Sequence, residues 1–229
     1  MLFRSLSRFT TEQRGILSAS LTLSGAVGVF AIAFGVLAVS SGASVAQTCA
    51  LSLLTFTGAS QFSAVGVIAG GGSASAAVGG ALMLAARNAI YGLAVAPHLK
   101  GSLGKRLVTA HFVIDETTAM MSAQGDPEKR KFAFWWTALP LFVFWNLGTL
   151  LGALLGNAVD SNAFGLDVAF SAGFVAMLAP HLAHTRGRQA AALGAAICLV
   201  LVPFVPVGLP ILASGLAIFI GVRPDEEGR

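Results

Sequence analysis

Long apolar segments, separated by short polar or glycine-rich stretches, follow one another along most of the chain. A helix of about 20 apolar residues is long enough to cross the hydrocarbon core of a bilayer. We therefore expect transmembrane helices wherever an apolar segment reaches or approaches this length. These segments cover residues 16–40, 45–69, 75–99, 132–156, 166–184, 189–205 and 209–222.

Segment 107–123 is harder to interpret, because it is short for a span and contains His111, Asp115 and Glu116. Three interpretations stay open: a short span, a re-entrant helix, and an interfacial helix. If the segment spans, the chain has eight transmembrane helices and both termini lie in the cytoplasm. If it is re-entrant, the count falls to seven and one terminus moves to the other side.

The basic residues constrain this topology, because cytoplasmic loops carry an excess of Lys and Arg. Basic residues in segments 1–15, 124–131 and 184–188 favour eight spans, or seven full spans plus a short broken one. In the eight-span arrangement the basic loop that contains Lys100 and Lys105 would lie outside, against the same rule.

Two further features bear on the architecture. The triple glycine at 70–72 is either a plain loop or the unwound centre of a discontinuous helix, and glycine's turn preference favours the loop. Phe30 and Phe34 share a spacing of four with Phe170 and Phe174, near the start of two expected spans. This faint echo is compatible with an internal inverted repeat.

Composition narrows the class to an all-α, polytopic transmembrane helical bundle. Of the 229 residues, 55% are hydrophobic and 10% are charged, whereas soluble domains carry about 25% charged residues. The 27 glycines suit close helix packing in lipid. We expect about seven or eight spans, some short or broken, in one transmembrane domain over 16–222. A cytoplasmic segment, 1–15, precedes this domain, and a polar tail, 223–229, follows it.

Charge and motifs exclude several classes of protein. The net charge of +4 and the pI of about 9.6 indicate basic cytoplasmic loops, not nucleic-acid binding. The sequence contains no phosphate-binding Walker motif, no Cys/His metal spacing and no nucleophile elbow. We therefore expect no enzyme activity, no cofactor and no bound metal.

Arg87 is the one formal charge between Arg14 and Lys100. A charge at the centre of a membrane helix costs roughly 2.5–3.5 kcal/mol on insertion scales. Arg87 therefore either snorkels to a headgroup or belongs to a functional polar centre. We predict that its guanidinium turns into the bundle and contacts Asp115, Glu116 or a backbone carbonyl near the triple glycine.

Other polar residues in apolar segments complete a candidate polar centre. A carboxylate and an arginine can offset each other's desolvation, and a carboxylate in a low-dielectric site holds a proton more readily. The alternative is that the two acidic residues are exposed at a helix end. The candidates are Gln61, Arg87, Asn88, Tyr91, His111, Asp115, Glu116 and Asn146.

Five stretches together resemble the AzlC family, the large subunit of two-component branched-chain amino acid exporters. They run in the family's order and are residues 56–62, 86–92, 114–117, 166–170 and 207–211. Gly-Ala-Ser-Gln at 58–61 and Asp-Glu-Thr at 115–117 are the more specific pieces. The sequence departs from the family pattern at Arg87, which precedes Asn88 and has no His after the pair.

This resemblance implies a multi-pass protein of the bacterial inner membrane. It implies export of valine, leucine, isoleucine and sometimes methionine, driven by the proton motive force, with a small AzlD-type membrane subunit as partner. It also implies the site candidates Gln61, Arg87, Asn88, Tyr91, Asp115 and Glu116.

Three functions remain open from the residues alone. The first is a secondary exporter in which Arg87 binds the substrate carboxylate and Asp115 or Glu116 binds its ammonium group. The second is a non-transporting scaffold or accessory subunit. The third is a membrane-embedded enzyme that uses His111 with Asp115. The sequence leaves homo-oligomers open and does not identify which amino acid is carried.

Overall fold

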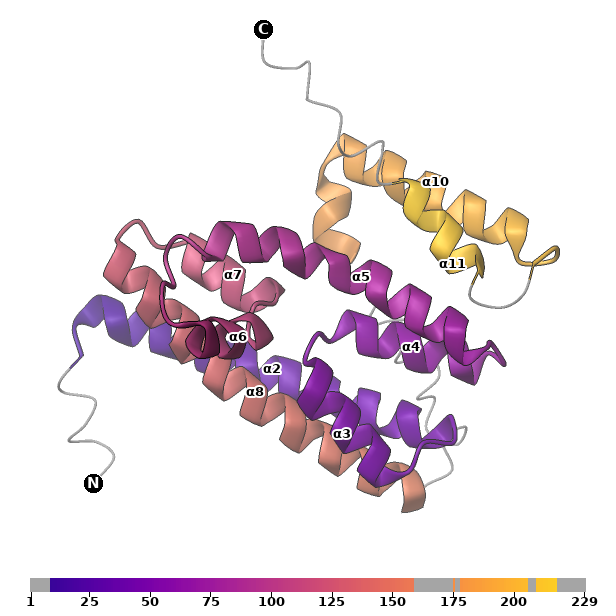
Figure 1. Cartoon of the computed structure of the whole chain (residues 1–229), viewed down its shortest axis with the longest axis horizontal. Coiled ribbons are helices and arrows are strands. Elements are labelled where there is room, and N and C mark those ends of the chain that lie inside the picture. The colour runs from indigo at the N-terminus through magenta and orange to yellow at the C-terminus, as the bar shows by residue number, and fades with distance from the viewer. Residues whose placement is uncertain (1–8, 159–174, 176–177, 206–208, 218–229) are drawn as a thin grey trace, which may run out of the picture.

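The computed structural model describes residues 9–158, 175, 178–205 and 209–217, and every regular element within them is a helix (Figure 1). In this part of the chain, α2, α5 and α8 are long and apolar enough to cross a membrane. The predicted all-helical membrane fold is confirmed at this level. The elements are α2 (Thr11–Ser40), α3 (Val45–Thr55), α4 (Ala59–Ala69), α5 (Ala74–Val95), α6 (Leu103–His111), α7 (Asp115–Ser122), α8 (Pro127–Ala158), η2 (Ala179–Ala183), α10 (Thr185–Leu201), α11 (Leu209–Ser214) and η3 (Gly215–Ala217).

Helices α2 and α8 form the main pair of the fold and run side by side in the same direction (Figure 1). Glu12 of α2 forms an ion pair with Lys129, near the start of α8. Farther along, the buried hydroxyls of Ser20 and Thr137 lie 2.8 Å apart. The offset between the paired residues is the same in both contacts, which is what a parallel pair requires.

Three glycines of α8 let the two backbones touch. A Cβ on Gly148 would overlap the carbonyl oxygen of Gly28, and one on Gly152 would overlap that of Ile32. Gly156 lies one turn farther against α2. A spacing of four places the three glycines on one helical face, and small residues allow close approach of helices in lipid. We call this contact the glycine seam.

Helices α3 and α4 do not form one span but reverse direction, and we call them the first hairpin. Successive residues of α3 and its C-cap contact α8 first at Thr149 and then at Phe142, whereas α4 contacts it at Trp145. The chain therefore turns back about halfway along α8. The contacts are Ser52 to Thr149 (3.1 Å between hydroxyls), Phe56 to Phe142 (4.9 Å between ring centroids) and Phe62 to Trp145 (6.3 Å).

The prediction of a continuous span over 45–69 is therefore wrong. The chain breaks at 56–58, where Phe56 and Gly58 have positive φ angles of 27° and 58°. That backbone region is rare for a bulky residue and easy for glycine. The triple glycine at 70–72 forms the plain turn that glycine's preference favoured, with Gly71 at a φ of 81°.

Segment 107–123 contains the end of α6 and all of α7, two short helices that form the second hairpin. At the tip of this hairpin, His111 and Phe112 pack on Phe142, near the middle of α8. Farther along α7, Met121 packs with Phe134, closer to the start of α8. The second hairpin thus enters from the end opposite to the first. This geometry matches the re-entrant interpretation.

The tips of the two hairpins meet in the middle of the bundle. The ring of Phe56 stacks on His111 at 5.9 Å and meets Phe112 edge-on at 6.0 Å. Helix α5 crosses beside them, packed against α4 around Val67 and Ala77. Two half-length hairpins from opposite ends thus take the place of two full spans.

This topology removes the conflict over the basic loops. Lys100, Lys105 and Lys131 line one surface hollow, and Nη1 of Arg130 lies 2.9 Å from Nε2 of His98. The basic residues after α5 and those at the start of α8 therefore share one end of the bundle, which we call the basic end. No loop has to violate the positive-inside rule.

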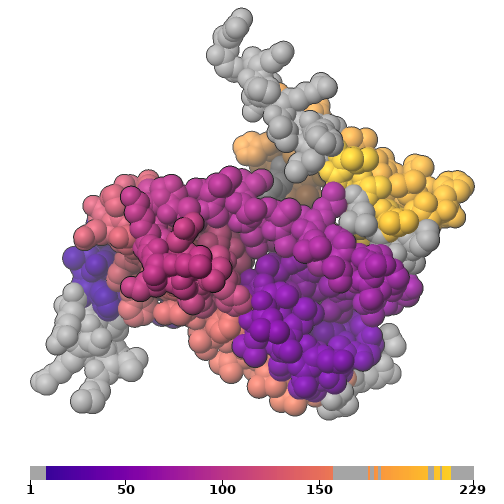
Figure 2. Space-filling model, viewed as in Figure 1, coloured from indigo at the N-terminus to yellow at the C-terminus, as the bar shows by residue number. Residues whose placement is uncertain are grey.

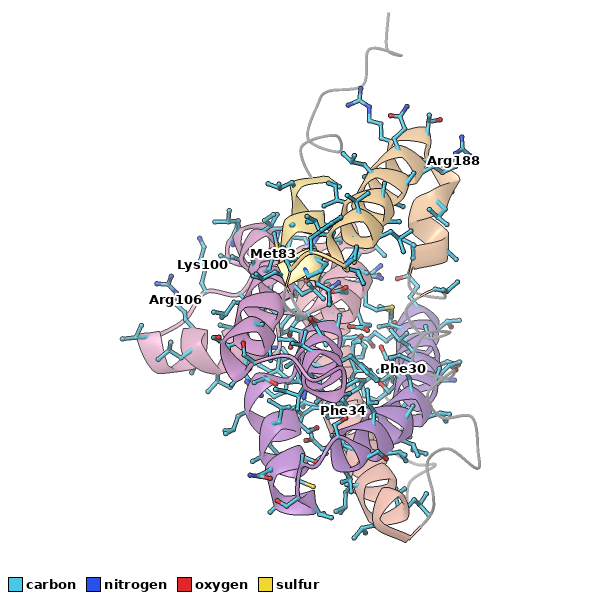
Figure 3. The ribbon with its side chains drawn as sticks, turned by 90° about the vertical axis from the view of Figure 1, so that its right-hand side faces the viewer. Phe30, Phe34, Met83, Lys100, Arg106 and Arg188 are labelled. Atoms are coloured by element: carbon cyan, nitrogen blue, oxygen red, sulfur yellow. The ribbon has the colours of Figure 1, made fainter. Side chains whose placement is uncertain are left out.

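Of the C-terminal helices, α11 packs against α5 and α10 packs against α11 (Figure 1). Gly215 contacts the Met83 side chain, which Figure 3 shows reaching from α5 toward this layer. The expected span over 189–205 overlaps α10, which has 17 residues and is not among the helices long and apolar enough to cross a membrane. Most of segment 166–184, the end of 209–222, and the positions Phe170 and Phe174 lie outside the described residues.

Candidate functional site

A cavity of about 320 Å³ lies where the two hairpin tips, α2, α5 and α8 come together. One end is polar and the remaining wall is apolar and aromatic. Its position halfway along α8 places it at the midplane of the bundle. The lining residues are Ala26, Val27, Phe30, Phe56, Thr57, Gly58, Ala59, Arg87, Ile114, Asp115, Glu116, Leu141 and Trp145.

An ion pair joins α5 to the second hairpin at the polar end. Nη1 of Arg87 lies 2.8 Å from Oδ2 of Asp115, and about a third of each side chain is exposed. The prediction that Arg87 turns inward to an acidic partner is confirmed. Its Nε is buried without a hydrogen-bond partner, so the guanidinium keeps donor capacity beyond the ion pair.

Both hairpins begin their second helix at this cavity, and both close the break with the third residue of that helix. In the first hairpin, Oε1 of Gln61 accepts hydrogen bonds from the N–H groups of Thr57 (3.3 Å) and Gly58 (3.0 Å). Nε2 of Gln61 donates to the carbonyl of Leu51 at 3.1 Å. This side chain therefore ties α3 to α4 across the break.

Thr117 has the same place in the second hairpin. Its hydroxyl accepts from the N–H of Ile114 at 3.1 Å and donates to the carbonyl of Phe112 at 2.7 Å. Backbone freed by a helix break needs such partners inside a membrane. The two hairpins are thus built alike and enter from opposite ends. The second differs in placing two carboxylates, Asp115 and Glu116, at the start of its returning helix.

The polar end combines opposite charges with helix N-termini. The first residues of α4 and α7, Ala59 and Asp115, both line the cavity. Helix N-termini attract anionic groups through their free N–H groups and the helix dipole. Glu116 lines the same end and has no ion-pair partner among the described residues.

Aromatic rings form the opposite wall. Phe30 packs on Phe62, which in turn packs on Trp145. Trp145 is 3% exposed and lines the cavity, and its indole Nε1 is buried without a hydrogen-bond partner. A buried indole N–H usually finds an acceptor. A ligand in the cavity could supply that acceptor.

The structure brings only some of the predicted site residues together. Arg87, Asp115 and Glu116 line the cavity, and His111 stacks on its wall residue Phe56. Gln61, 1% exposed, lies behind the cavity in the break that it closes. Asp115 is the first residue of α7 and pairs with Arg87 of α5, so it does not lie in a free loop.

Besides Gln61 and His111, three further predicted residues do not line the cavity. Tyr91 packs against a cluster that includes Val95 and Met121. Nδ2 of Asn146 donates to the carbonyl of Phe142 in its own helix at 2.8 Å. Oδ1 of Asn88 is buried without a hydrogen-bond partner.

Sequence reasoning missed Trp145, Thr57 and Gly58 as lining residues. Gly58 carried a signal, since a glycine within an apolar segment marks a break or a close backbone approach. Trp145 carried none, because tryptophan is common in membrane helices.

Hairpins that meet at a charged cavity between apolar helices define a polytopic membrane protein with an internal polar site. The model of the AzlC protein family matches residues 23–159, and the chain belongs to this family. The matched residues include both hairpins, the ion pair and the glycine seam.

Relatives in bacteria agree with this membership. The chain is 26% identical to an uncharacterized membrane protein of Helicobacter pylori over 81% of this chain and 85% of the relative. It is 28% identical to the branched-chain amino acid transport protein AzlC of Bacillus subtilis, over 63% of this chain and 58% of the relative. It is also 25% identical to an uncharacterized membrane protein of Haemophilus influenzae, over 74% of this chain and 70% of the relative. No solved structure matches the chain.

Proposed function

We propose that the protein is a secondary exporter of branched-chain or similar small apolar amino acids in the bacterial inner membrane. The observation that carries the proposal is the Arg87–Asp115 ion pair in a cavity between two oppositely inserted hairpins. Transporters build substrate sites from broken helices near the bilayer midplane. The name of the Bacillus subtilis relative supports the same substrate class.

The lining of the cavity suits a zwitterion with an apolar side chain. The free donor capacity of Arg87 and the N-termini of α4 and α7 can bind the carboxylate. Glu116, which has no ion-pair partner among the described residues, can bind the ammonium group. Phe30, Phe56 and Trp145 can enclose the aliphatic side chain by excluding water from it.

The two hairpins supply a route for alternating access. The second hairpin lies between the cavity and the basic end, which the positive-inside rule assigns to the cytoplasm. The first hairpin lies between the cavity and the opposite end. Movement of one tip at a time would open the cavity to one side only. Protonation of Asp115 or Glu116 would weaken the attraction that holds Arg87, which offers a means of proton coupling.

We include a small AzlD-type membrane subunit in the proposal, on the resemblance alone. Its contribution is tested by reconstituting the chain with and without it. Vesicles are loaded with labelled leucine, a proton gradient is imposed, and efflux is measured. We expect leucine, isoleucine and valine to leave faster than lysine or glutamate.

Glu116→Gln is the informative variant, and Glu128→Gln is its matched control because Glu128 is exposed at the start of α8. We expect Glu116→Gln to lower efflux and to remove its dependence on the proton gradient, while Glu128→Gln behaves as wild type. If branched-chain amino acids do not cross in either preparation, the exporter proposal is wrong and a scaffold role is favoured.

A further inference from the structure

The two hairpins and α5 together form what we call the hairpin region, and α6 is its least packed helix. None of its residues is buried, and three of its apolar side chains, Leu103, Leu107 and Val108, are more than half exposed. The helix lies on the face that Figure 2 turns toward the viewer. In a membrane protein these apolar side chains contact lipid, while the long side chains of Lys105 and Arg106 can extend to the interface at the basic end.

A hollow of about 500 Å³ separates α6 from the last turn of α5. Its walls are mostly apolar and include Val95, Leu99 and Val113. An empty space of this size loses the dispersion contacts that a filled one makes. At this depth of a membrane protein, an acyl chain is the molecule available to fill it.

Positive charge gathers at the mouth of the hollow. Lys100 and Arg106 line it and project to the same side of the bundle (Figure 3). A second hollow of about 420 Å³ on the neighbouring face of α6 is lined by Lys105, Lys131 and Trp135. No carboxylate lines either hollow in the described part of the chain. Trp135 marks the interfacial depth at which tryptophan is enriched.

We propose that the hollow between α5 and α6 binds one anionic phospholipid. Its phosphate lies against Lys100 and Arg106, and one acyl chain fills the apolar part toward Val113. Basic pockets between membrane helices on the cytoplasmic side bind anionic headgroups. Nothing in the family match or in the names of the relatives concerns a lipid.

The site would act on the second hairpin. Val113, at the tip of that hairpin, is 6% exposed and lines the hollow, and Asp115 follows two residues later. A lipid seated here would hold α6 against α5 and so fix the position of the tip. This consequence does not depend on which substrate the cavity takes.

The test uses the full chain, purified and stripped of lipid. Phosphatidylglycerol or phosphatidylcholine is added, and bound lipid is counted by native mass spectrometry together with the unfolding temperature. We expect phosphatidylglycerol to bind and to raise the unfolding temperature, and phosphatidylcholine to do neither. Inorganic phosphate should leave the unfolding temperature unchanged, because it cannot fill the apolar part.

The Lys100→Gln/Arg106→Gln variant should bind phosphatidylglycerol about 25-fold more weakly, since each of the two basic residues near an anionic surface contributes about a fivefold gain. Arg14→Gln/Arg188→Gln removes the same charge from exposed positions outside both hollows and should bind as wild type. Lys100→Arg/Arg106→Lys keeps both charges and should retain the lipid.

Two results would overturn the proposal. The first is equal binding of phosphatidylglycerol and phosphatidylcholine by the wild-type protein, which needs no variant. The second is an equal loss of binding in the two glutamine variants, which would show that only the net charge matters.

Discussion

The α2–α8 pair and the hairpin region, made of the two hairpins and α5, use similar apolar residues in opposite ways. In the pair, backbones touch along the glycine seam and neutral hydroxyls such as Ser20 and Thr137 satisfy each other. In the hairpin region, helices stop at mid-depth, Arg87 and Asp115 carry charge, and a cavity remains.

The difference separates support from function. Close packing leaves the pair a single arrangement, because interiors at this density resist deformation. The hairpins are short, end at a cavity and pack partly through aromatic rings, so they can shift at lower cost. We infer that α2 and α8 form a rigid frame and that the hairpins and α5 supply the parts that bind and move at the cavity.

The largest loss of stability is expected at the glycine seam, where the backbones of α2 and α8 leave no room for a side chain. Gly148→Ala/Gly152→Ala places two methyl groups against the backbone of α2, so the helices must separate. Each overpacked position should lower the stability of the protein by about 2 kcal/mol, so the variant should lose most of its folded yield. Thermal unfolding in detergent and size-exclusion profiles measure the loss.

A matched double variant tests whether the seam is the cause. A Cβ on Gly15 or Gly25 of α2 meets nothing within 4 Å. Gly15→Ala/Gly25→Ala should therefore fold as well as wild type or slightly better, because alanine favours helix. Equal losses in the two variants would show that the frame does not depend on the seam.

The next effect concerns the ion pair of the hairpin region. Arg87→Ala leaves Asp115 without its partner and should lower efflux at least tenfold. Because both side chains are about a third exposed, the stability loss should be about 1–2 kcal/mol, less than for a buried pair. Efflux from vesicles and thermal unfolding report the two effects separately.

Arg87→Lys separates binding from structure. An ammonium keeps the charge but lacks the planar two-donor fork of arginine. If Arg87 binds the substrate carboxylate, this variant should fold normally and export poorly. A well-folded Arg87→Ala protein with normal efflux would refute both roles.

The side chains that close the two hairpin breaks should contribute differently to stability, although the breaks are built alike. Gln61→Leu leaves two N–H groups unpaired at the first break and removes the link to Leu51, whose carbonyl keeps the hydrogen bond from the Thr55 hydroxyl. Thr117→Val leaves one N–H group and one carbonyl unpaired at the second break. We expect a loss of about 2–3 kcal/mol for Gln61→Leu and about 1–2 kcal/mol for Thr117→Val. Thermal unfolding of the two variants ranks them, and the reverse order would contradict this account.

The charged end of the cavity could be predicted from the sequence because charge is expensive in lipid. A lone arginine in an apolar segment must find a partner, and Asp115 was among the few carboxylates within reach of a membrane helix. The membrane class followed from composition in the same way. Both inferences depend on the free energy of placing charged groups in lipid, which is several kcal/mol and exceeds local conformational preferences.

The hairpins could not be predicted in this way. Gly58 is a local sign of a break in 45–69, but glycine is also common in membrane helices, and the break includes Phe56, a residue with no turn preference. Tertiary contacts with His111 and Phe142 hold this conformation, and a sequence does not display them. The triple glycine gave the stronger local signal and proved to be an ordinary turn at a helix end.

A smaller effect is expected at the backbone of the first break. Gly58 has a φ of 58°, and the nearest atom to an added Cβ, in Trp145, is 3.7 Å away. Gly58→Ala should thus cost about 1 kcal/mol through backbone strain alone, without a clash. Gly92→Ala in α5, where nothing lies within 4 Å, is the control and should unfold at or above the wild-type temperature.

The smallest effect is expected at the exposed start of α8, which tests whether a helix cap in water contributes less than the caps in the hairpins. Oδ1 of Asp126 accepts hydrogen bonds from the N–H groups of Glu128 (2.7 Å) and Lys129 (3.2 Å). These two hydrogen bonds hold the pKa of the Asp126 carboxyl below its ordinary value, and the bond from the Lys129 N–H has the larger effect. The stabilisation is therefore present above the ordinary aspartate pKa and is lost as pH falls through the lowered value.

Asp126→Ala removes both hydrogen bonds and the charge, whereas Asp126→Asn keeps an acceptor and removes the charge. Asp126→Ala should lower the unfolding temperature near neutral pH by less than Thr117→Val does, because water can replace a lost cap at an exposed position. Asp126→Asn should fall between Asp126→Ala and wild type. The difference between wild type and Asp126→Asn should shrink below the ordinary aspartate pKa. An Asp126→Ala loss larger than that of Gln61→Leu would reverse the comparison, because the exposed end of the frame would then limit stability more than the breaks at the cavity.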